Sequence, residues 1–286
     1  MPMTYQTLIS ISDLAAHLGD PDFVLVDARF SLADPDYGWR NYREAHIPGA
    51  VYAHLDEDLS APVIMGITGR HPLPQPGHAA EVFSRWGIPS GGQVVVYDDL
   101  GGALAAVRVW WMLRWLGFDS VAVLDGGWQA WLQSRKPVRG GDEHRQSLPF
   151  TARPRPELVV STADVEPMVN DPGWLVLDAR SADRYRGENE TIDPIAGHIP
   201  GAVSAPYAGN LNPDGSFRSL EQLRTRYQRL LGSLPAERTV VYCGSGVTSI
   251  HDILAIQHAG MGEARLYAGS WSEWITDPKR GVATAG

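Results

Sequence analysis

The sequence predicts an α/β protein of two tandem domains, each a parallel β-sheet flanked by helices on both faces. Two observations lead to this class. Four segments recur in the same order in the two halves of the 286-residue chain, and such self-similarity indicates a duplicated domain. Within each half, short β-branched runs alternate with helical patterns. Near-continuous apolar strands separated by helices are typical of parallel sheets that are buried on both faces.

The repeated segments define the domains. They pair "DPDFVLVDAR" (20–29) with "DPGWLVLDAR" (171–180), "HIPGAVYA" (46–53) with "HIPGAVSA" (198–205), "VVVYDD" (94–99) with "TVVYCG" (239–244), and "LDGGWQAW" (124–131) with "YAGSWSEW" (267–274). Residues 138–156 between the copies are rich in Pro, Gly and charge and have no apolar period, which is typical of a linker. We therefore predict an N-terminal domain at 1–137 and a C-terminal domain at 157–286.

Each copy contains three clear strand patterns. The β-branched runs predict strands over 23–28, 94–98 and 121–126, and over 174–179, 239–243 and 264–269. Helical spacing predicts helices over 103–117 and 248–260, and each ends in a glycine that fits a C-cap. In sheets of this kind ligands bind beyond the carboxyl ends of the strands. We therefore look for chemistry where the strands end.

Composition excludes several classes of protein. Twenty-four basic and thirty-three acidic residues give a net charge of −9, and without a block of Lys or Arg, nucleic acid and anionic membranes are poor partners. A single cysteine cannot form an internal disulfide, which argues against the disulfide-stapled secreted class. No signal sequence or membrane-length apolar stretch is visible. We expect a cytoplasmic protein.

The single cysteine, Cys243, follows a predicted strand and precedes a predicted helix. A helix N-terminus directs N–H groups and positive dipole at the thiol, which favours the thiolate. Gly244 and Gly246 allow successive amides to curl into an anion-binding nest, and Ser245 and Thr248 add hydroxyl donors. This setting favours a nucleophilic or sulfur-carrying cysteine over a buried structural one.

The first copy has Asp98 at the position of Cys243. A carboxylate cannot act as a soft nucleophile toward sulfur, and Asp98 with Asp99 is expected to spoil an anion-binding loop. We therefore predict that the N-terminal domain does not carry out the chemistry.

These motifs together resemble the tandem-domain rhodanese-type sulfurtransferases, the family of the 3-mercaptopyruvate and thiosulfate enzymes. The resemblance rests on the two "HIPGAV" segments, "RVWWMLRWLG", "LDGGWQAW" and the loop "CGSGVT". It implies two rhodanese folds and a Cys243 persulfide that carries sulfur from a small anionic donor to a thiophilic acceptor such as cyanide or a thiol. A thioredoxin-like reductant is a further candidate partner, and no metal or cofactor is expected.

The resemblance also implies roles for single residues. Arg184 in "DRYRGE" matches the family's donor-binding arginine, and the loop Gly244–Thr248, with Val247, would hold the transferred sulfur. Thiosulfate enzymes have cations in this loop, whereas Gly244 and Ser245 are neutral, which favours 3-mercaptopyruvate. Thiosulfate is the alternative donor. A binding module that relays sulfur to a protein without turnover is the non-enzymatic alternative.

Two features depart from the family's pattern or stay open. A second donor-binding arginine is expected just before "GHIPG", but Thr191 lies there among acidic residues. A proton relay is expected to pair Ser245, a predicted catalytic residue, with a histidine. His46 is the candidate, although His198 repeats it and suggests a structural role.

A cysteine phosphatase is excluded because Ser249 stands where its loop needs an arginine.

Overall fold

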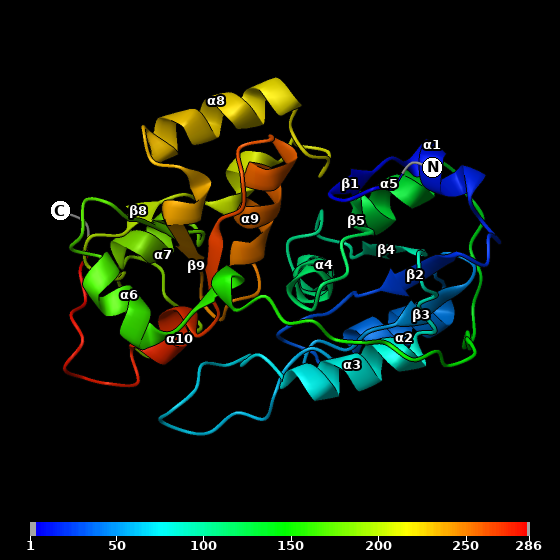
Figure 1. The fold of residues 1–286 in the computed structure, drawn as a ribbon, viewed down its shortest axis with the longest axis horizontal. Coiled ribbons are helices and arrows are strands. Elements are labelled where there is room, and N and C mark those ends of the chain that lie inside the picture. Colours follow the sequence, from blue (N-terminus) through cyan, green and yellow to red (C-terminus); the bar gives the residue numbers. More distant parts are fainter. Residues whose placement is uncertain (1–3, 285–286) are drawn as a thin grey trace. The chain divides into compact units, whose positions relative to one another are not determined.

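The computed structural model describes residues 4–284 and contains two compact units, each with its own five-stranded sheet (Figure 1). The first unit consists of Met1–Ser60, Pro74–Arg155 and Asn212–Phe217, and the second of Ala61–Leu73, Pro156–Leu211 and Arg218–Gly286. Each half of the chain thus gives one short segment to the other unit. The segment 138–156, predicted as a linker, belongs to the first unit as far as Arg155.

The first unit contains a parallel sheet of strand order β1-β5-β4-β2-β3. Its strands are β1 (Leu8–Ile9), β2 (Phe23–Asp27), β3 (Ala50–Tyr52), β4 (Gln93–Tyr97) and β5 (Val121–Leu124). Its helices are α1 (Ile11–Ala16), α2 (Tyr37–Glu44), α3 (Pro76–Arg85), α4 (Ala105–Trp115) and α5 (Gly127–Gln133). Side chains of α1 and α5 pack with Val95 and Tyr97 of the central strand β4 in one apolar cluster.

The second unit repeats this order as β6-β10-β9-β7-β8, again with all strands parallel. Its strands are β6 (Val159–Val160), β7 (Leu175–Asp178), β8 (Val203–Ser204), β9 (Thr239–Tyr242) and β10 (Arg265–Tyr267). Its helices are α6 (Thr162–Met168), α7 (Ala182–Arg186), α8 (Leu220–Leu231), α9 (Ser249–His258) and α10 (Ser270–Trp274), with short 3-10 turns η1 (Pro156–Leu158), η2 (Tyr207–Asn210) and η3 (Ala236–Arg238). The predicted α/β class of two parallel sheets is confirmed.

The repeated Asp-Ala-Arg segments serve the fold in both units. In each, the aspartate ends a central strand and binds the arginine two residues later through a buried ion pair of 2.6 Å, Asp27–Arg29 and Asp178–Arg180. Each arginine also donates to a distant backbone carbonyl at 2.6 Å and lies over a buried tryptophan ring. Because a buried charge is tolerated when it is paired and hydrogen-bonded, these contacts stabilise both sheets alike. Among residues 4–284, no helix has the length and apolar character needed to cross a membrane.

Candidate active site

Cys243 lies where the central strand β9 of the second unit ends, and the loop 243–248 joins it to α9. The thiol side chain is buried, with 3% of the residue exposed. The Cys243 N–H donates to Ser270 Oγ at 3.1 Å, and its carbonyl accepts from the Trp271 N–H at 3.0 Å. The start of α10 therefore fixes the loop, which we call the Cys243 loop.

The two glycines of the Cys243 loop each leave room for a close neighbour. Gly246 has φ 74°, and a Cβ at this position would overlap the carbonyl oxygen of Ala268. A Cβ on Gly244 would lie 2.7 Å from Nη2 of Arg70 and 3.6 Å from Nη2 of Arg184. Glycine at 244 thus lets two guanidinium groups approach the backbone beside Cys243.

Arg184, on α7, is engaged by carboxylates. Its Nε and Nη2 donate to Glu190 at 3.0 and 2.9 Å, and Nη2 also donates to Asp193 Oδ2 at 3.0 Å. Arg70 Nη1 donates to the other oxygen of Asp193. The side chains of Glu190 and Asp193 are only 2% and 1% exposed. Two buried carboxylates therefore balance the charge of the two guanidiniums.

Arg70 comes from the segment Ala61–Leu73, which the first half of the chain contributes to the second unit. Its N–H donates to Ser272 Oγ at 3.1 Å. Burial lowers the pKa of Arg70, and an electrostatic interaction with Cys243 opposes that shift. Sequence reasoning missed Arg70 because it searched for the second arginine close to Arg184 in the chain, whereas this segment has neither a repeat nor a periodic pattern.

A histidine of the same segment contacts the loop serine. His71 Nδ1 lies 2.8 Å from Ser245 Oγ, and both residues are buried. The ring nitrogen can accept the hydroxyl proton or donate to the oxygen, depending on the tautomer. The Ser–His pair expected beside the cysteine is therefore present in the second unit, with His71 as its histidine.

His46, the candidate suggested by the sequence, lies in the first unit. Its ring stacks on Tyr42, and its Nδ1 lies 2.7 Å from the Tyr42 carbonyl. His198 makes the same two contacts with Tyr185, again with 2.7 Å to the carbonyl. A contact made equally in both units supports the structural interpretation of this repeated histidine.

The corresponding loop of the first unit, residues 98–104, already holds an anion. The Asp98 carboxylate accepts four backbone N–H bonds between 2.8 and 3.4 Å, from residues 100, 102, 104 and 106. Burial raises the pKa of Asp98 to about 6, against the effect of these donors. The donors are present in this loop, and the Asp98 side chain fills their site. That aspartate spoils the loop for an external anion stays a prediction.

The rhodanese-like domain family matches the chain twice, over residues 10–134 and 161–277. The chain belongs to the rhodanese family. A Pseudomonas aeruginosa protein named "Probable 3-mercaptopyruvate sulfurtransferase" is 49% identical over 283 residues. The matched region covers 99% of this chain and 99% of that protein. The thiosulfate sulfurtransferase of Rattus norvegicus is 31% identical, over 95% of this chain and 92% of its own. The crystal structure of SseA from Escherichia coli, described as a 3-mercaptopyruvate sulfotransferase with the rhodanese fold, superposes with a TM-score of 0.80 at 30% identity, over 94% of this chain and all of that one.

The protein is thus a tandem rhodanese-type sulfurtransferase, and its second rhodanese unit brings most predicted site residues together. Cys243 and Ser245 belong to one loop, and Arg184 lies beside Gly244 of that loop. Val247 is buried with 3% exposed, and Thr248 is the N-cap residue of α9. The residues that sequence reasoning did not supply, Arg70 and His71, both belong to Ala61–Leu73.

Proposed function

We propose that Cys243 takes a sulfur atom from 3-mercaptopyruvate, holds it as a persulfide, and passes it to a thiol or cyanide. The observation that carries the proposal is the convergence of two guanidiniums and a Ser–His pair on one cysteine loop. Arg70 and Arg184 can pair with the donor's carboxylate, since guanidinium–carboxylate pairs are strong and directional. The names of the relatives from Pseudomonas aeruginosa and Escherichia coli support this donor.

The first half-reaction forms one bond and breaks one. The Cys243 thiolate attacks the donor sulfur, the new S–S bond forms, and the C–S bond breaks with its electron pair left on carbon as the enolate of pyruvate. The proton of the donor thiol ends on that carbon, giving pyruvate and a persulfide anion. The Cys243 loop leads directly into the N-terminus of α9, whose positive dipole end would stabilise the developing negative charge.

The Ser245–His71 pair would carry this proton. His71 Nδ1, 2.8 Å from Ser245 Oγ, can accept the hydroxyl proton as the serine receives one from the donor thiol, and the reverse transfer returns a proton to the enolate carbon. A positioned acid–base pair typically contributes 10²- to 10⁴-fold. In the second half-reaction the acceptor thiolate or cyanide attacks the outer sulfur, and Cys243 leaves as a thiolate.

Thiosulfate is the second candidate donor. Two guanidiniums beside Gly244 would suit a dianion, although the loop itself has no cationic side chain, and the relative from Rattus norvegicus is named for thiosulfate. A thioredoxin-like dithiol is a candidate acceptor for either donor, since it can attack the persulfide and release the outer sulfur as sulfide while the dithiol becomes a disulfide.

A sulfur-loading experiment tests the proposal. The reduced protein is incubated with 3-mercaptopyruvate or thiosulfate, and the intact mass is measured before and after cyanide. We expect a gain of one sulfur atom at Cys243, reversal by cyanide, and a higher kcat/KM for 3-mercaptopyruvate. A folded protein that gains no sulfur from either donor would contradict sulfur transfer through Cys243. A higher kcat/KM for thiosulfate would make thiosulfate the preferred donor.

A further inference from the structure

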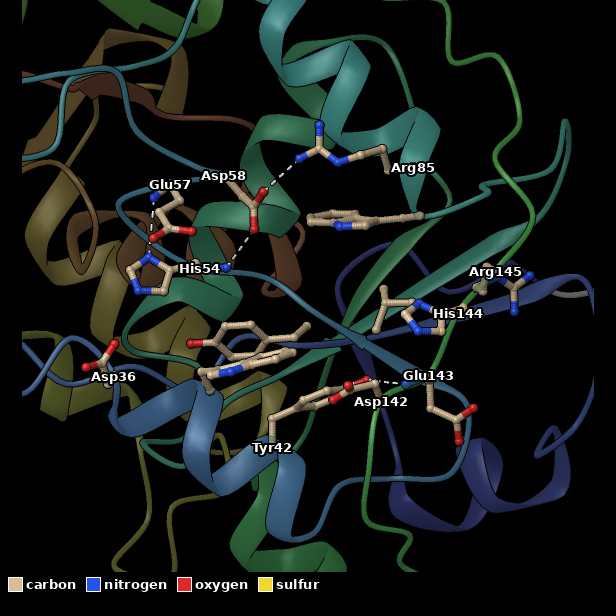
Figure 2. Close-up of a pocket in the computed structure, with 14 residues that line it drawn as sticks. Asp36, Tyr42, His54, Glu57, Asp58, Arg85, Asp142, Glu143, His144 and Arg145 are labelled. Carbon is tan, nitrogen blue, oxygen red and sulfur yellow. Dashed lines mark hydrogen bonds and ion pairs between the residues drawn. The ribbon is translucent and has the colours of Figure 1, made fainter.

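The first unit contains a cavity of about 510 Å³ lined only by residues of that unit (Figure 2). Its walls come from α2, from β3 and the loop after it, from the end of α3, and from residues 142–145 of the segment that joins the two repeats. The volume lies in the range of small-molecule sites. We propose that this cavity binds a small organic cation that carries an aromatic or apolar group.

Aromatic rings form one wall of the cavity. The rings of Trp39, Tyr42 and Tyr52 lie with their centroids 5.5 to 5.6 Å apart, and Trp86 also lines the site. Trp39 is 39% exposed, so part of its large apolar surface remains available. The guanidinium of Arg43 already lies 5.8 Å from the Trp39 centroid. This contact shows that the ring is placed where it can attract a cation.

Carboxylates surround these rings, and Figure 2 shows several of them around the cavity. The five that line it are Asp36, Glu57, Asp58, Asp142 and Glu143. Three of them are already paired: Asp58 with Arg85 at 3.0 Å, and Asp142 and Glu143 with Arg43 and Arg139 at 3.2 Å. Arg145, the other arginine of the lining, donates to two backbone carbonyls and keeps its charge. The cavity therefore has more negative than positive charge available to a ligand.

Asp36 and Glu57 form no ion pair within 4 Å among residues 4–284, although the charge of Asp36 adds to that of Asp34 in raising the pKa of Arg40. Both are labelled in Figure 2 on the same side of the cavity, next to His54. The field of the carboxylates reaches the rings, because Asp58 and Glu57 add to the effect of burial in raising the pKa of Tyr52. An ammonium group beside Asp36 and Glu57 would find charge pairing, and its apolar part would find the rings.

The second unit shows that the fold does not require this wall. The aligned segments "HIPGAVYAH" and "HIPGAVSAP" place Ser204 and Pro206 where the first unit has Tyr52 and His54. Both units nevertheless build β3 and β8 as the same edge strand of the same sheet. Tyr52 and His54 of the lining are thus particular to the first unit, the unit that lacks the cysteine.

Calorimetric titration of the whole protein with three matched probes tests the proposal. The probes are 2-phenylethylamine, which is protonated at neutral pH, 2-phenylethanol, which is neutral, and phenylacetate, which is anionic. We expect saturable binding of the amine at one site per chain, binding of the alcohol weaker by roughly tenfold or more, and no binding of phenylacetate to the cavity.

Three variants locate the site. Tyr52→Ser introduces the residue of the second unit and should weaken amine binding roughly tenfold, whereas Tyr52→Phe keeps the ring and should bind nearly as the parent protein. Asp36→Asn with Glu57→Gln removes only exposed charge, so it tests the site even if Tyr52→Ser does not fold. This double variant should weaken the amine several-fold and leave the alcohol unchanged. Glu221→Gln on α8, in the second unit, is the matched charge control.

Sulfur loading of Cys243 should be the same in every variant, so this proposal can fail while the proposed function stands. Three outcomes would overturn it: no amine binding to the folded parent protein, equal affinity for the amine and the alcohol, or amine binding unchanged by both Tyr52→Ser and the double charge variant. A lysine-rich peptide that binds where the amine does not would also overturn it, in favour of a protein partner.

Discussion

The Cys243 loop and the loop that follows Asp98 show how one fold is used in two ways. Each loop follows the central strand of a parallel sheet and leads into a buried helix. In the first unit a side-chain carboxylate accepts the backbone donors of the loop, whereas in the second unit the same position holds a thiol. We propose that both loops hold an anion, which belongs to the chain in the first unit and arrives with a substrate in the second.

A built-in carboxylate also appears near Cys243, but it is held differently. Asp193 bridges Arg70 and Arg184 through their side chains, while Asp98 is held by backbone amides that cannot move without unfolding the loop. Flexible guanidiniums can change partners, and fixed amides cannot. We infer that a donor carboxylate can replace Asp193 at the two arginines, while the first unit stays closed to external anions.

Substitutions at Cys243 and Asp98 should have the largest effect on sulfur transfer. Cys243→Ser should lower sulfur transfer by more than about 10³-fold, because the nucleophile is lost. Asp98→Cys in that background should not restore it, since no described arginine pair or Ser–His pair adjoins the Asp98 loop within the first unit. Intact mass after donor treatment measures both. Sulfur found at position 98 would show that backbone donors alone suffice for loading.

Removal of a guanidinium should have the next largest effect. Arg184→Ala should lower kcat/KM for 3-mercaptopyruvate by roughly 10- to 100-fold, because a hydrogen-bonded charge pair of about 1.5–3 kcal/mol is lost. Arg70→Ala should act similarly and mainly through KM. Arg186→Ala on the same helix is the control, since its ion pair with Glu188 is solvent-exposed. Parent-like kinetics of Arg184→Ala would remove this residue from the donor site.

Loss of the Ser–His contact should change kcat more than KM. His71→Gln keeps a polar side chain but cannot exchange a proton, so we expect kcat to fall about 10²-fold. His46→Gln is the comparison, because His46 contacts Tyr42 in the first unit, and should lower stability rather than kcat. A lower kcat in His46→Gln with an unchanged kcat in His71→Gln would instead assign the proton relay to His46.

The features of the two units that depend on local sequence pattern could be predicted from the sequence. The β-branched runs located both central strands and Cys243 at a strand end, and glycines past α4 and α9 marked their ends, with positive φ at Gly117 and Gly260. The short strands β1, β3, β6 and β8 were not predicted, since two or three residues show no period. Arg70 and His71 could not be found because their role depends on tertiary placement of an irregular segment. The filled Asp98 loop could not be found either, because a side chain that accepts N–H bonds from its own loop leaves no sequence pattern.

Neutralisation of Asp193 should have a smaller effect, and in the opposite direction. Asp193→Asn removes the charge shared by Arg70 and Arg184, so a donor carboxylate no longer competes with an internal one. We expect KM for 3-mercaptopyruvate to fall roughly threefold to tenfold, with kcat little changed. Glu188→Gln, which removes the carboxylate of the exposed ion pair with Arg186, is the control. A higher KM in Asp193→Asn would mean that Asp193 positions the arginines instead of competing for them.

Neutralisation of Asp98 should leave sulfur transfer unchanged and alter only the first unit's stability. Burial raises the pKa of Asp98 from 3.8 to about 6. The folded state therefore binds a proton more readily than the unfolded one, and this group's stabilisation is present at low pH and lost as pH rises through 6. Between pH 7 and pH 4.5 it amounts to about 2 kcal/mol.

Hydrogen exchange of α4 in the first unit and of α9 in the second can separate the two units. Asp98→Asn should remove this pH dependence from α4 only. Asp252→Asn should remove it from α9 only, because burial also raises the pKa of Asp252 to about 6. If Asp98→Asn left the pH dependence of α4 unchanged, the carboxylate would be ionised throughout this range, and the donors of its loop would outweigh its burial. The first unit would then hold a full negative charge in the position where the second unit is proposed to hold a persulfide.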